Sequence, residues 1–263
     1  MFSITVVWYF GTLRCYNGED DYPSRTFCWL QARFMGPNTV AWSKIGCVCF
    51  DVDSTVCVDD GINEFARFLR CKEVENITMR AMNGELDLTE ALTMRLDAMK
   101  PSSMKVSEFL TSRKSNLTPG VRSLINQLRE SGIKVCLVSG GLYPFVAKVA
   151  EDVGIPLDNV FSNRLIFAED GSYAGFDTSA PTCQSNGKAL VVGELMKRFH
   201  TLVAFVGDGM TDARACPPAE VFIGFGGNVE RPAVRAATPY FFHSMNEISK
   251  FFKSVGLIPK HTH

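Results

Sequence analysis

The chain has 263 residues, of which 46% are hydrophobic and 21% are charged, and its formal net charge is −1. This composition excludes an intrinsically disordered chain and suffices for one large core with a small accessory domain. The near-zero charge provides no basic footprint, so we do not expect nucleic acid as a partner. The nine cysteines show no C-x-x-C spacing, which indicates free thiols in a reducing compartment.

Residues 1–44 are an extension to which the sequence assigns no role. The apolar run Met1–Phe10 is too short to span a bilayer, and no Lys or Arg precedes it as in a secretory signal. The acids Glu19, Asp20 and Asp21 disfavour a transit peptide. We therefore expect a cytoplasmic protein without membrane association, whose extension adds a strand to the domain or drapes over it.

From Ile45 onward, short β-branched runs alternate with amphipathic segments, a pattern typical of βα units. We predict an α/β fold with a doubly wound, mostly parallel sheet. The strands predicted for the core are Ile45–Phe50, Ile133–Val138, Leu202–Val206 and Val221–Ile223. The helices predicted between them are Val121–Arg129, Tyr143–Val153 and Ala189–Phe199. A hairpin is predicted at Arg164–Phe167 and Tyr173–Phe176, around an Asp-Gly turn, as an antiparallel addition to the sheet.

Residues 61–116 differ from the rest of the chain because they contain no strand of comparable strength. Apolar residues recur at helical spacing from Ile62 to Leu69, and more helix formers follow. We predict a small helical cap at 61–116, inserted after the first core strand and able to serve as a lid. The core then consists of residues 45–60 and 117–263.

Polar residues follow directly on three of the predicted strands. Asp51 and Asp53 follow the first strand, Ser139 and Gly140 the second, and Asp208 the third. Because ligands of doubly wound sheets bind outside the carboxyl ends of the strands, we expect these residues to line one crevice. Taken singly, each is better explained by a turn or a helix cap. Their placement at successive strand ends favours a shared site.

The residue types suit phosphoryl transfer. One aspartate beside Mg²⁺ can attack phosphorus and form an aspartyl-phosphate, while a second carboxylate protonates the leaving alcohol and then activates water. Carboxylates from two loops supply the oxygen ligands that Mg²⁺ prefers. Lys188, at the start of a predicted helix, would offset the charge on the phosphoryl group. The chain contains 27 Lys and Arg, so the alternative interpretation of Lys188 is an ordinary charge on the exposed surface.

Four motifs of the chain resemble those of the haloacid dehalogenase superfamily of phosphatases. They are Asp51-Val52-Asp53-Ser54-Thr55, Ser139-Gly140-Gly141, Lys188 and Gly207-Asp208-Gly209-Met210-Thr211-Asp212. Further segments between about residues 45 and 250 are similar to the phosphoserine phosphatase family of the eukaryotic type, among them Leu117-Thr118-Pro119-Gly120, Asn163-Arg164-Leu165 and Ala215-Cys216-Pro217-Pro218-Ala219. The resemblance implies a Rossmann-like core and Mg²⁺-dependent hydrolysis of O-phosphoserine to serine and phosphate. It also implies the last step of the phosphorylated serine pathway, a small-molecule substrate, and a monomer or homodimer.

The resemblance further implies a role for each motif residue. Asp51 is the expected nucleophile and Asp53 the expected general acid and base. The expected Mg²⁺ ligands are Asp51, the backbone carbonyl of Asp53, and Asp208, with Asp212 in a supporting role. The expected contacts to the phosphoryl group come from Ser139, Gly140 and Lys188, with Thr211 beside the metal loop. In the cap, Arg95 is expected to bind the substrate carboxylate and Met82 to close the pocket.

Two positions depart from the family pattern. Asp60 stands where the family has a glutamate that binds the substrate ammonium, and it also occupies an ordinary N-cap position, so it can do both. Asn83 stands where a glycine follows the methionine in relatives. Both changes bear on specificity, so a phosphatase or phosphotransferase for another small phosphomonoester is the alternative function. A catalytically silent scaffold is a third hypothesis, which the full set of charged motif residues disfavours.

Overall fold

The computed structural model describes residues 5–9, 12–16, 40–82 and 85–259. Its centre is a six-stranded sheet in the order β10-β9-β8-β3-β4-β5, in which all neighbouring strands are parallel. The strands are β3 (Ile45–Phe50), β4 (Lys134–Leu142), β5 (Val160–Asn163), β8 (Leu202–Gly207), β9 (Val221–Phe225) and β10 (Phe241–Phe242). Because the central strands are buried on both faces, they are nearly continuous runs of Val, Ile, Phe and Cys. The predicted doubly wound parallel sheet is confirmed.

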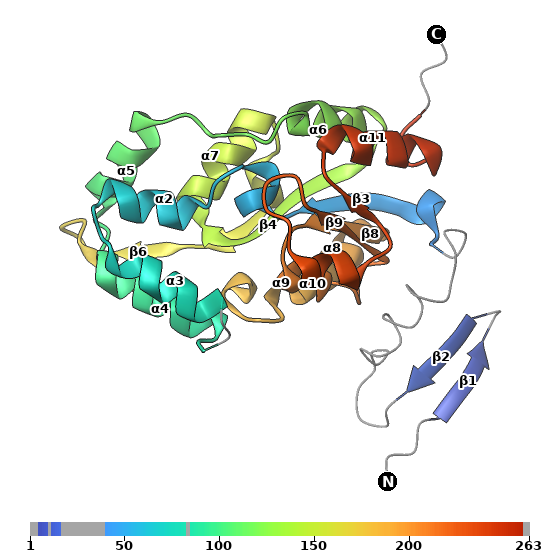
Figure 1. The fold of residues 1–263 in the computed structure, drawn as a ribbon, viewed down its shortest axis with the longest axis horizontal. Helices are drawn as coiled ribbons and strands as arrows, with labels where there is room; N and C mark the ends of the chain where they lie inside the picture. Colours follow the sequence, from blue (N-terminus) through green and yellow to red (C-terminus); the bar gives the residue numbers. More distant parts are fainter. Residues whose placement is uncertain (1–4, 10–11, 17–39, 83–84, 260–263) are drawn as a thin grey trace.

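Helices cover both faces of this sheet (Figure 1). One face carries α6 (Val121–Glu130), α7 (Tyr143–Val153) and α11 (Met245–Ser254). The other carries α8 (Gly187–Phe199), α9 (Met210–Ala213) and α10 (Pro232–Ala237). Alternate residues of a strand point to opposite faces, so Val48 and Phe50 join the core under α6 and α11, whereas Cys47 and Cys49 pack against α8.

The segment after β3 forms four helices, as predicted for the cap. They are α2 (Gly61–Phe68), α3 (Glu73–Met82), α4 (Leu88–Met99) and α5 (Ser103–Ser112). Asp60, Asp87 and Ser102 each accept a backbone N–H bond at the start of a helix, which explains where α2, α4 and α5 begin. Phe65 of α2 and Phe109 of α5 pack on Phe145 of the core helix α7 at ring-centroid distances of 5.1 and 5.0 Å. The division at residues 61 and 116 remains our proposal.

The predicted hairpin exists but does not extend the main sheet. Strands β6 (Leu165–Phe167) and β7 (Tyr173–Phe176) pair only with each other among the described strands. The expected antiparallel addition to the sheet is therefore wrong, and the edges of the described sheet are β5 and β10, two short strands that the sequence prediction missed. The hairpin packs against the cap instead, because its apolar side chains join the cap core and Gly171 O accepts a bond from Ser103 N at 2.9 Å.

The N-terminal extension contains a second hairpin. Strands β1 (Thr5–Tyr9) and β2 (Thr12–Tyr16) pair antiparallel, and within the described chain they do not join the six-stranded sheet. The described strands of the extension thus add nothing to the main sheet, and the alternative that the extension drapes over the domain stays a prediction. The end of the extension is anchored through Trp42, whose ring packs edge-on against Tyr240 and Phe251 at 5.6 and 5.2 Å.

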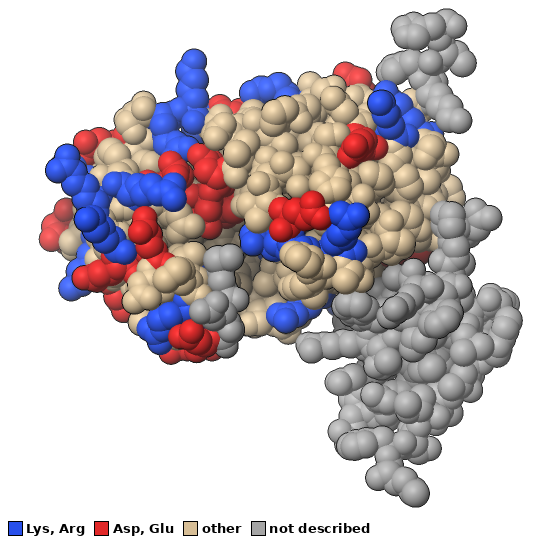
Figure 2. All heavy atoms as spheres, viewed as in Figure 1, with Lys and Arg blue, Asp and Glu red and all other residues tan. Residues whose placement is uncertain are grey.

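The surface of the described chain carries charges of both signs. On the face shown in Figure 2, acidic and basic side chains lie interspersed, most densely over the cap. In the described part of the chain, no helix has the length and apolar character needed to cross a membrane. Within the described chain, Cys47, Cys49 and Cys136 form no disulfide and are buried in the sheet.

Candidate active site

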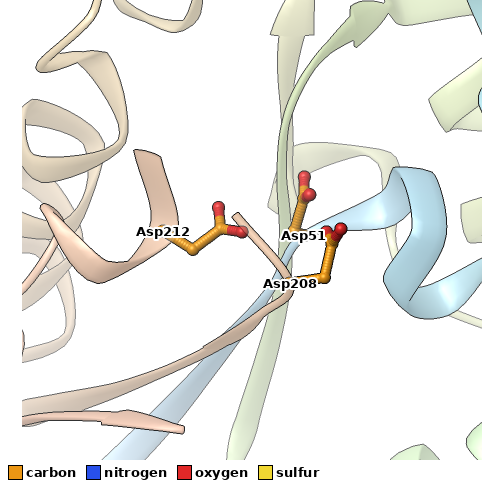
Figure 3. A group of neighbouring side chains, drawn as sticks. All are labelled: Asp51, Asp208 and Asp212. Atoms are coloured by element: carbon orange, nitrogen blue, oxygen red, sulfur yellow. The ribbon is translucent and has the colours of Figure 1, made fainter. Parts of the chain in front are cut away.

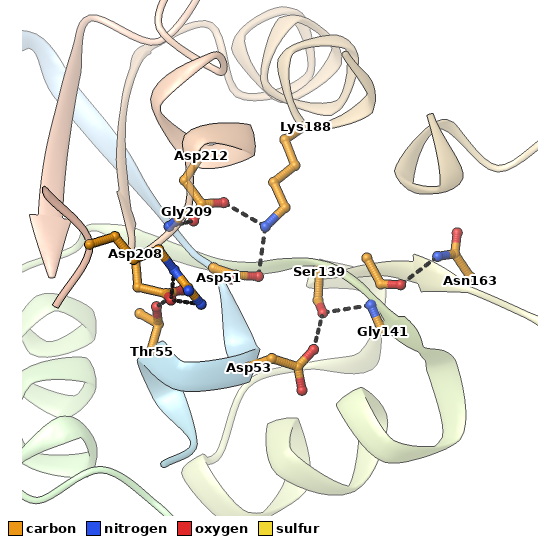
Figure 4. A network of polar contacts seen from close by, with 12 residues as sticks. Asp51, Asp53, Thr55, Ser139, Gly141, Asn163, Lys188, Asp208, Gly209 and Asp212 are labelled. Carbon is orange, nitrogen blue, oxygen red and sulfur yellow. Dashed lines mark hydrogen bonds and ion pairs between the residues drawn. The ribbon is translucent and has the colours of Figure 1, made fainter. Parts of the chain in front are cut away.

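The chain turns sharply after β3, and this turn presents Asp51 and Asp53 at the carboxyl edge of the sheet. Asp51 N donates to Val206 O at 2.9 Å, which keeps Asp51 in line with the strands. The backbone reverses at Ser54, whose φ of 57° lies in the left-handed region. Asp53 therefore projects away from the sheet, while Asp51 remains at its edge (Figure 4).

Three aspartates gather beside Lys188 (Figures 3 and 4). Carboxylate oxygens of Asp51, Asp208 and Asp212 lie within 4.8 Å of one another, and all three residues are buried. Lys188 Nζ contacts Asp51 Oδ1 at 2.7 Å and Asp212 Oδ1 at 2.5 Å. Burial opposes the charge of Lys188, but the two aspartates outweigh this effect and raise its pKa. Lys188 is 8% exposed, so it is not a solvated surface charge.

Asp208 has two further partners that sequence reasoning missed. Thr55 Oγ1 donates to Asp208 Oδ1 at 3.2 Å, and Arg231 Nε donates to Asp208 Oδ2 at 3.0 Å. Thr55 lies within a quoted motif, but nothing in the local pattern around Arg231 points to a carboxylate 23 residues away. These contacts fix the orientation of the carboxylate.

The side chain of Asp212 is held by the protein at both oxygens. Oδ1 contacts Lys188, and Oδ2 accepts a bond from Gly209 N at 2.8 Å. A Cβ on Gly207 would overlap the carboxylate of Asp212, so this close approach requires glycine. Asp212 therefore holds both the Lys188 ammonium and the backbone turn at Gly209, which suits it to a supporting role.

The acidic cluster fits a hard divalent cation. Its donor set consists of carboxylate oxygens alone, which is what Mg²⁺ prefers. Burial and the charge of Asp51 raise the pKa of Asp208 to about 6 and that of Asp212 to about 7. Crowded buried carboxylates with raised pKa values carry more negative charge than Lys188 and Arg231 offset, and a cation would relieve this repulsion.

These pKa shifts predict how the stability of the metal-free protein depends on pH. Folding raises the pKa values of Asp208 and Asp212 above the ordinary 3.8, so the folded state binds more protons than the unfolded state between about pH 4 and pH 7. We expect the melting temperature of EDTA-treated protein to fall as the pH rises from about 5.5 to about 8. Mg²⁺ should restore more stability at the higher pH than at the lower. Equal Mg²⁺ effects at both pH values would contradict a cation site at this cluster.

Asp53 is held apart from the acidic cluster. Its Oδ1 accepts a bond from Gly61 N at 2.8 Å, and its Oδ2 accepts one from Ser139 Oγ at 3.4 Å. Ser139 Oγ also accepts a bond from Gly141 N at 2.9 Å. Burial, together with the charges of Asp60 and Asp51, raises the pKa of Asp53 well above its usual range. A carboxyl group with a raised pKa keeps its proton to a higher pH than an ordinary aspartate, which suits general acid catalysis.

The glycine loop of the second motif is fixed by residues that were missed as site residues. Strand β4 continues to Leu142, so Ser139 and Gly140 lie within its final residues and not after it. Asn163 Nδ2 donates to Gly140 O at 2.8 Å, and Thr182 Oγ1 donates to Asn163 Oδ1 at 2.8 Å. Asn163 stood in a segment that resembled the family, which was the available signal for it.

The cap residues are placed less completely than the core residues. Asp60 caps α2 by accepting a bond from Asn63 N at 2.9 Å, and burial raises its pKa. Arg95 Nε is buried without a hydrogen-bond partner among the described residues. Burial lowers the pKa of Arg95, while the charges of Asp60 and Asp53 act in the opposite direction. Met82 ends α3.

For the remaining predicted positions the structure describes few or no side-chain contacts. The side chain of Met82 and the whole of Asn83 lie outside the described residues. Thr211 lies in the first turn of α9, between Asp208 and Asp212. The structure therefore brings the core residues of the prediction together and puts Asp60 and Arg95 on the cap side, with electrostatic coupling between them.

Comparison with known proteins places this architecture in a family. Residues 48–216 match the model of the haloacid dehalogenase-like hydrolases. The chain is 45% identical to a phosphoserine phosphatase of Rattus norvegicus over 203 residues, which cover 76% of this chain and 90% of the rat protein. Solved structures of phosphoserine phosphatases are similar as well. A phospho-aspartyl intermediate analogue superimposes with a TM-score of 0.68 at 28% identity, covering 79% of this chain and 99% of the other.

A substrate-bound phosphoserine phosphatase complex is equally similar, with a TM-score of 0.69 at 26% identity and coverage of 79% of this chain and 98% of the other. The sheet, the helical insert and the strand-end carboxylates define a hydrolase of the haloacid dehalogenase type. The chain belongs to the haloacid dehalogenase-like hydrolases and, within them, to the phosphoserine phosphatase family. The predicted fold and enzyme class are thereby confirmed.

Proposed function

We propose that this enzyme hydrolyses O-phosphoserine to serine and phosphate through an aspartyl-phosphate on Asp51, with Mg²⁺ as cofactor. The observation that carries the proposal is the buried group of Asp51, Asp208 and Asp212 beside Lys188, with the separately held Asp53. The relatives named phosphoserine phosphatase support the substrate. The similar phospho-aspartyl analogue supports the intermediate.

The two aspartates of the first motif divide the chemistry. A carboxylate oxygen of Asp51 attacks phosphorus, and Asp53 donates its proton to the departing serine oxygen. Asp53, now ionised, takes a proton from the water that attacks phosphorus in the second step and releases Asp51. Ser139 and Lys188 stabilise the charge on the phosphoryl oxygens. Mg²⁺, held by Asp51, Asp208 and the backbone carbonyl of Asp53, would add charge neutralisation at the same oxygens.

The cap would recognise the amino-acid part of the substrate. Arg95 offers a guanidinium with an unpartnered Nε, which suits a carboxylate. Asp60 offers a carboxylate for the ammonium group while it caps α2. Met82 would close the pocket by its apolar side chain. From this specificity we infer that the enzyme catalyses the last step of the phosphorylated serine pathway. We place it in the cytoplasm.

Replacement of Arg95 tests the substrate assignment. We expect Arg95→Ala to raise KM for phosphoserine roughly 10- to 100-fold, because charge-assisted hydrogen bonds contribute about 1.5–3 kcal/mol. KM for phosphoethanolamine, which lacks the carboxylate, should change much less. Phosphate release by wild type and variant, with and without Mg²⁺, measures both substrates.

Arg67→Ala is the matched control, since Arg67 is a cap arginine that pairs with Glu64 at the exposed surface. It should leave both KM values unchanged. Equal increases in KM for phosphoserine and phosphoethanolamine in Arg95→Ala would reject the carboxylate contact. Wild-type preference for phosphothreonine or a sugar phosphate would favour the alternative phosphomonoesterase.

A further inference from the structure

A cavity of about 60 Å³ opens between the two segments that connect the cap to the core. Asp53 lines it, together with Asp59 of the first connection, Ser115 of the second, and Phe145 of α7. Among the described lining residues are none of the groups that surround the phosphoryl position, Asp51, Ser139 and Lys188. The cavity therefore reaches the general acid and base from the hinge side.

The mouth of this cavity is held in shape by contacts between the two connections. Val58 N donates to Asn116 O at 2.9 Å, and Cys57 forms an isolated antiparallel bridge with Leu117. Arg113 Nη2 contacts Asp59 Oδ2 at 2.5 Å. These contacts join the two connections to each other beside the cavity.

The cavity is chemically suited to water. Its lining combines the apolar side chains of Phe109, Leu110 and Phe145 with polar groups, among them the Asp53 carboxylate. Arg113 and Lys148 also line it, and their side chains are 29% and 35% exposed. A volume of about 60 Å³ exceeds the ~10–15 Å³ that one bound water needs, and the polar groups can serve as its hydrogen-bond partners.

Asp53 also differs from its neighbours in access. Asp51 and Lys188 are each 8% exposed and Ser139 is fully buried, whereas Asp53 is only half-buried. Asp53, the proposed base for the hydrolytic water, therefore lines this cavity, whereas the residues that contact the phosphoryl group do not.

We propose that this cavity is the entry route of the hydrolytic water, which reaches Asp53 from the hinge side while the cap is closed. The proposal rests on the proposed function. In the step concerned, the water oxygen forms a bond to phosphorus, the bond from phosphorus to the Asp51 oxygen breaks, and the water proton passes to Asp53. The products are phosphate and the free Asp51 carboxylate. Because the attacking and leaving oxygens lie in line at phosphorus, the water reacts at the position that the serine oxygen has left, and the cavity is its route to that position.

Filling the cavity tests the water route. Leu110→Trp places a larger side chain in it, and Thr111→Trp is the matched control, because Thr111 is exposed on the same helix and does not line the cavity. We measure dephosphorylation of the aspartyl-phosphate by rapid quench, and exchange of labelled serine into phosphoserine. Leu110→Trp should slow dephosphorylation about tenfold or more, which corresponds to about 1.4 kcal/mol in barrier. Serine exchange should be unchanged.

Other results have definite meanings. Equal slowing of dephosphorylation and serine exchange would show a distorted site and overturn the water route, as would an unaffected dephosphorylation rate. Val149→Phe fills the same cavity from α7 and repeats the test if Leu110→Trp destabilises the chain. Failure of the wild-type enzyme to form a phosphoenzyme from phosphoserine would instead reject the proposed function.

Discussion

Asp51→Asn is expected to abolish phosphate release, with a loss in kcat of about 10⁴-fold or more, because the nucleophile and its charge are removed together. Asparagine preserves the shape of the side chain, and Lys188 keeps its contact with Asp212, so the fold should persist. Steady-state phosphate release measures the loss. Acid quench after mixing with ³²P-phosphoserine should find no phosphoenzyme.

Asp53→Asn is the comparison that makes this result specific. This substitution also replaces a carboxylate by an amide of equal size, two residues after Asp51, but it leaves the nucleophile in place. We expect it to form the phosphoenzyme slowly and to hydrolyse it more slowly still, since general acid and base assistance contributes about 10²- to 10⁴-fold. If Asp51→Asn still formed the phosphoenzyme, the nucleophile would have to be another residue.

Lys188→Met is expected to damage both activity and stability. Removal of the Lys188 ammonium leaves the carboxylates of Asp51 and Asp212 buried without their cation. Loss of one partner of a buried ion pair lowers the free energy of unfolding by roughly 3–5 kcal/mol. The transferring phosphoryl group also loses a positive neighbour, which we expect to lower kcat by about 10²- to 10³-fold. Thermal unfolding and phosphate release measure the two effects separately.

The control is Lys197→Met, the same substitution at an exposed position of the same helix. It should leave the melting temperature and kcat nearly unchanged. Mg²⁺ should recover part of the stability of Lys188→Met, because a second cation at the cluster offsets the same repulsion. A variant with normal kcat and lowered stability would limit Lys188 to a structural role.

The sheet and its motifs could be predicted from local sequence because their signals are local. Each core strand is a short apolar run buried on both faces, and the aspartate motifs follow directly on β3 and β8. Strand β3 was predicted at its observed bounds, Ile45–Phe50. Parallel strands all end at the same edge of their sheet. Asp51 and Asp208 each follow such a strand, so they could be placed together from the amino-acid sequence alone.

Contacts between distant segments were beyond this kind of prediction. The hairpin pattern around Gly171 was recognised, but its packing against the cap depends on Ser103, far away in the chain. Arg231 pairs with Asp208, and Asn163 orients Gly140, without any periodicity that links them. Whether an arginine or asparagine is a surface residue or a positioning residue depends on what packs beside it.

By itself, the amino-acid sequence determined the parallel α/β core, the helical insert and the residues able to perform phosphoryl transfer, because periodicity and strand-end position are properties of neighbouring residues. Only the tertiary structure decided how these residues share their work. It buried Lys188 between two aspartates, held Asp53 apart beside Gly61, and opened the hinge cavity behind it. Burial and charge at a site arise from the packing of distant segments, and no local pattern contains that information.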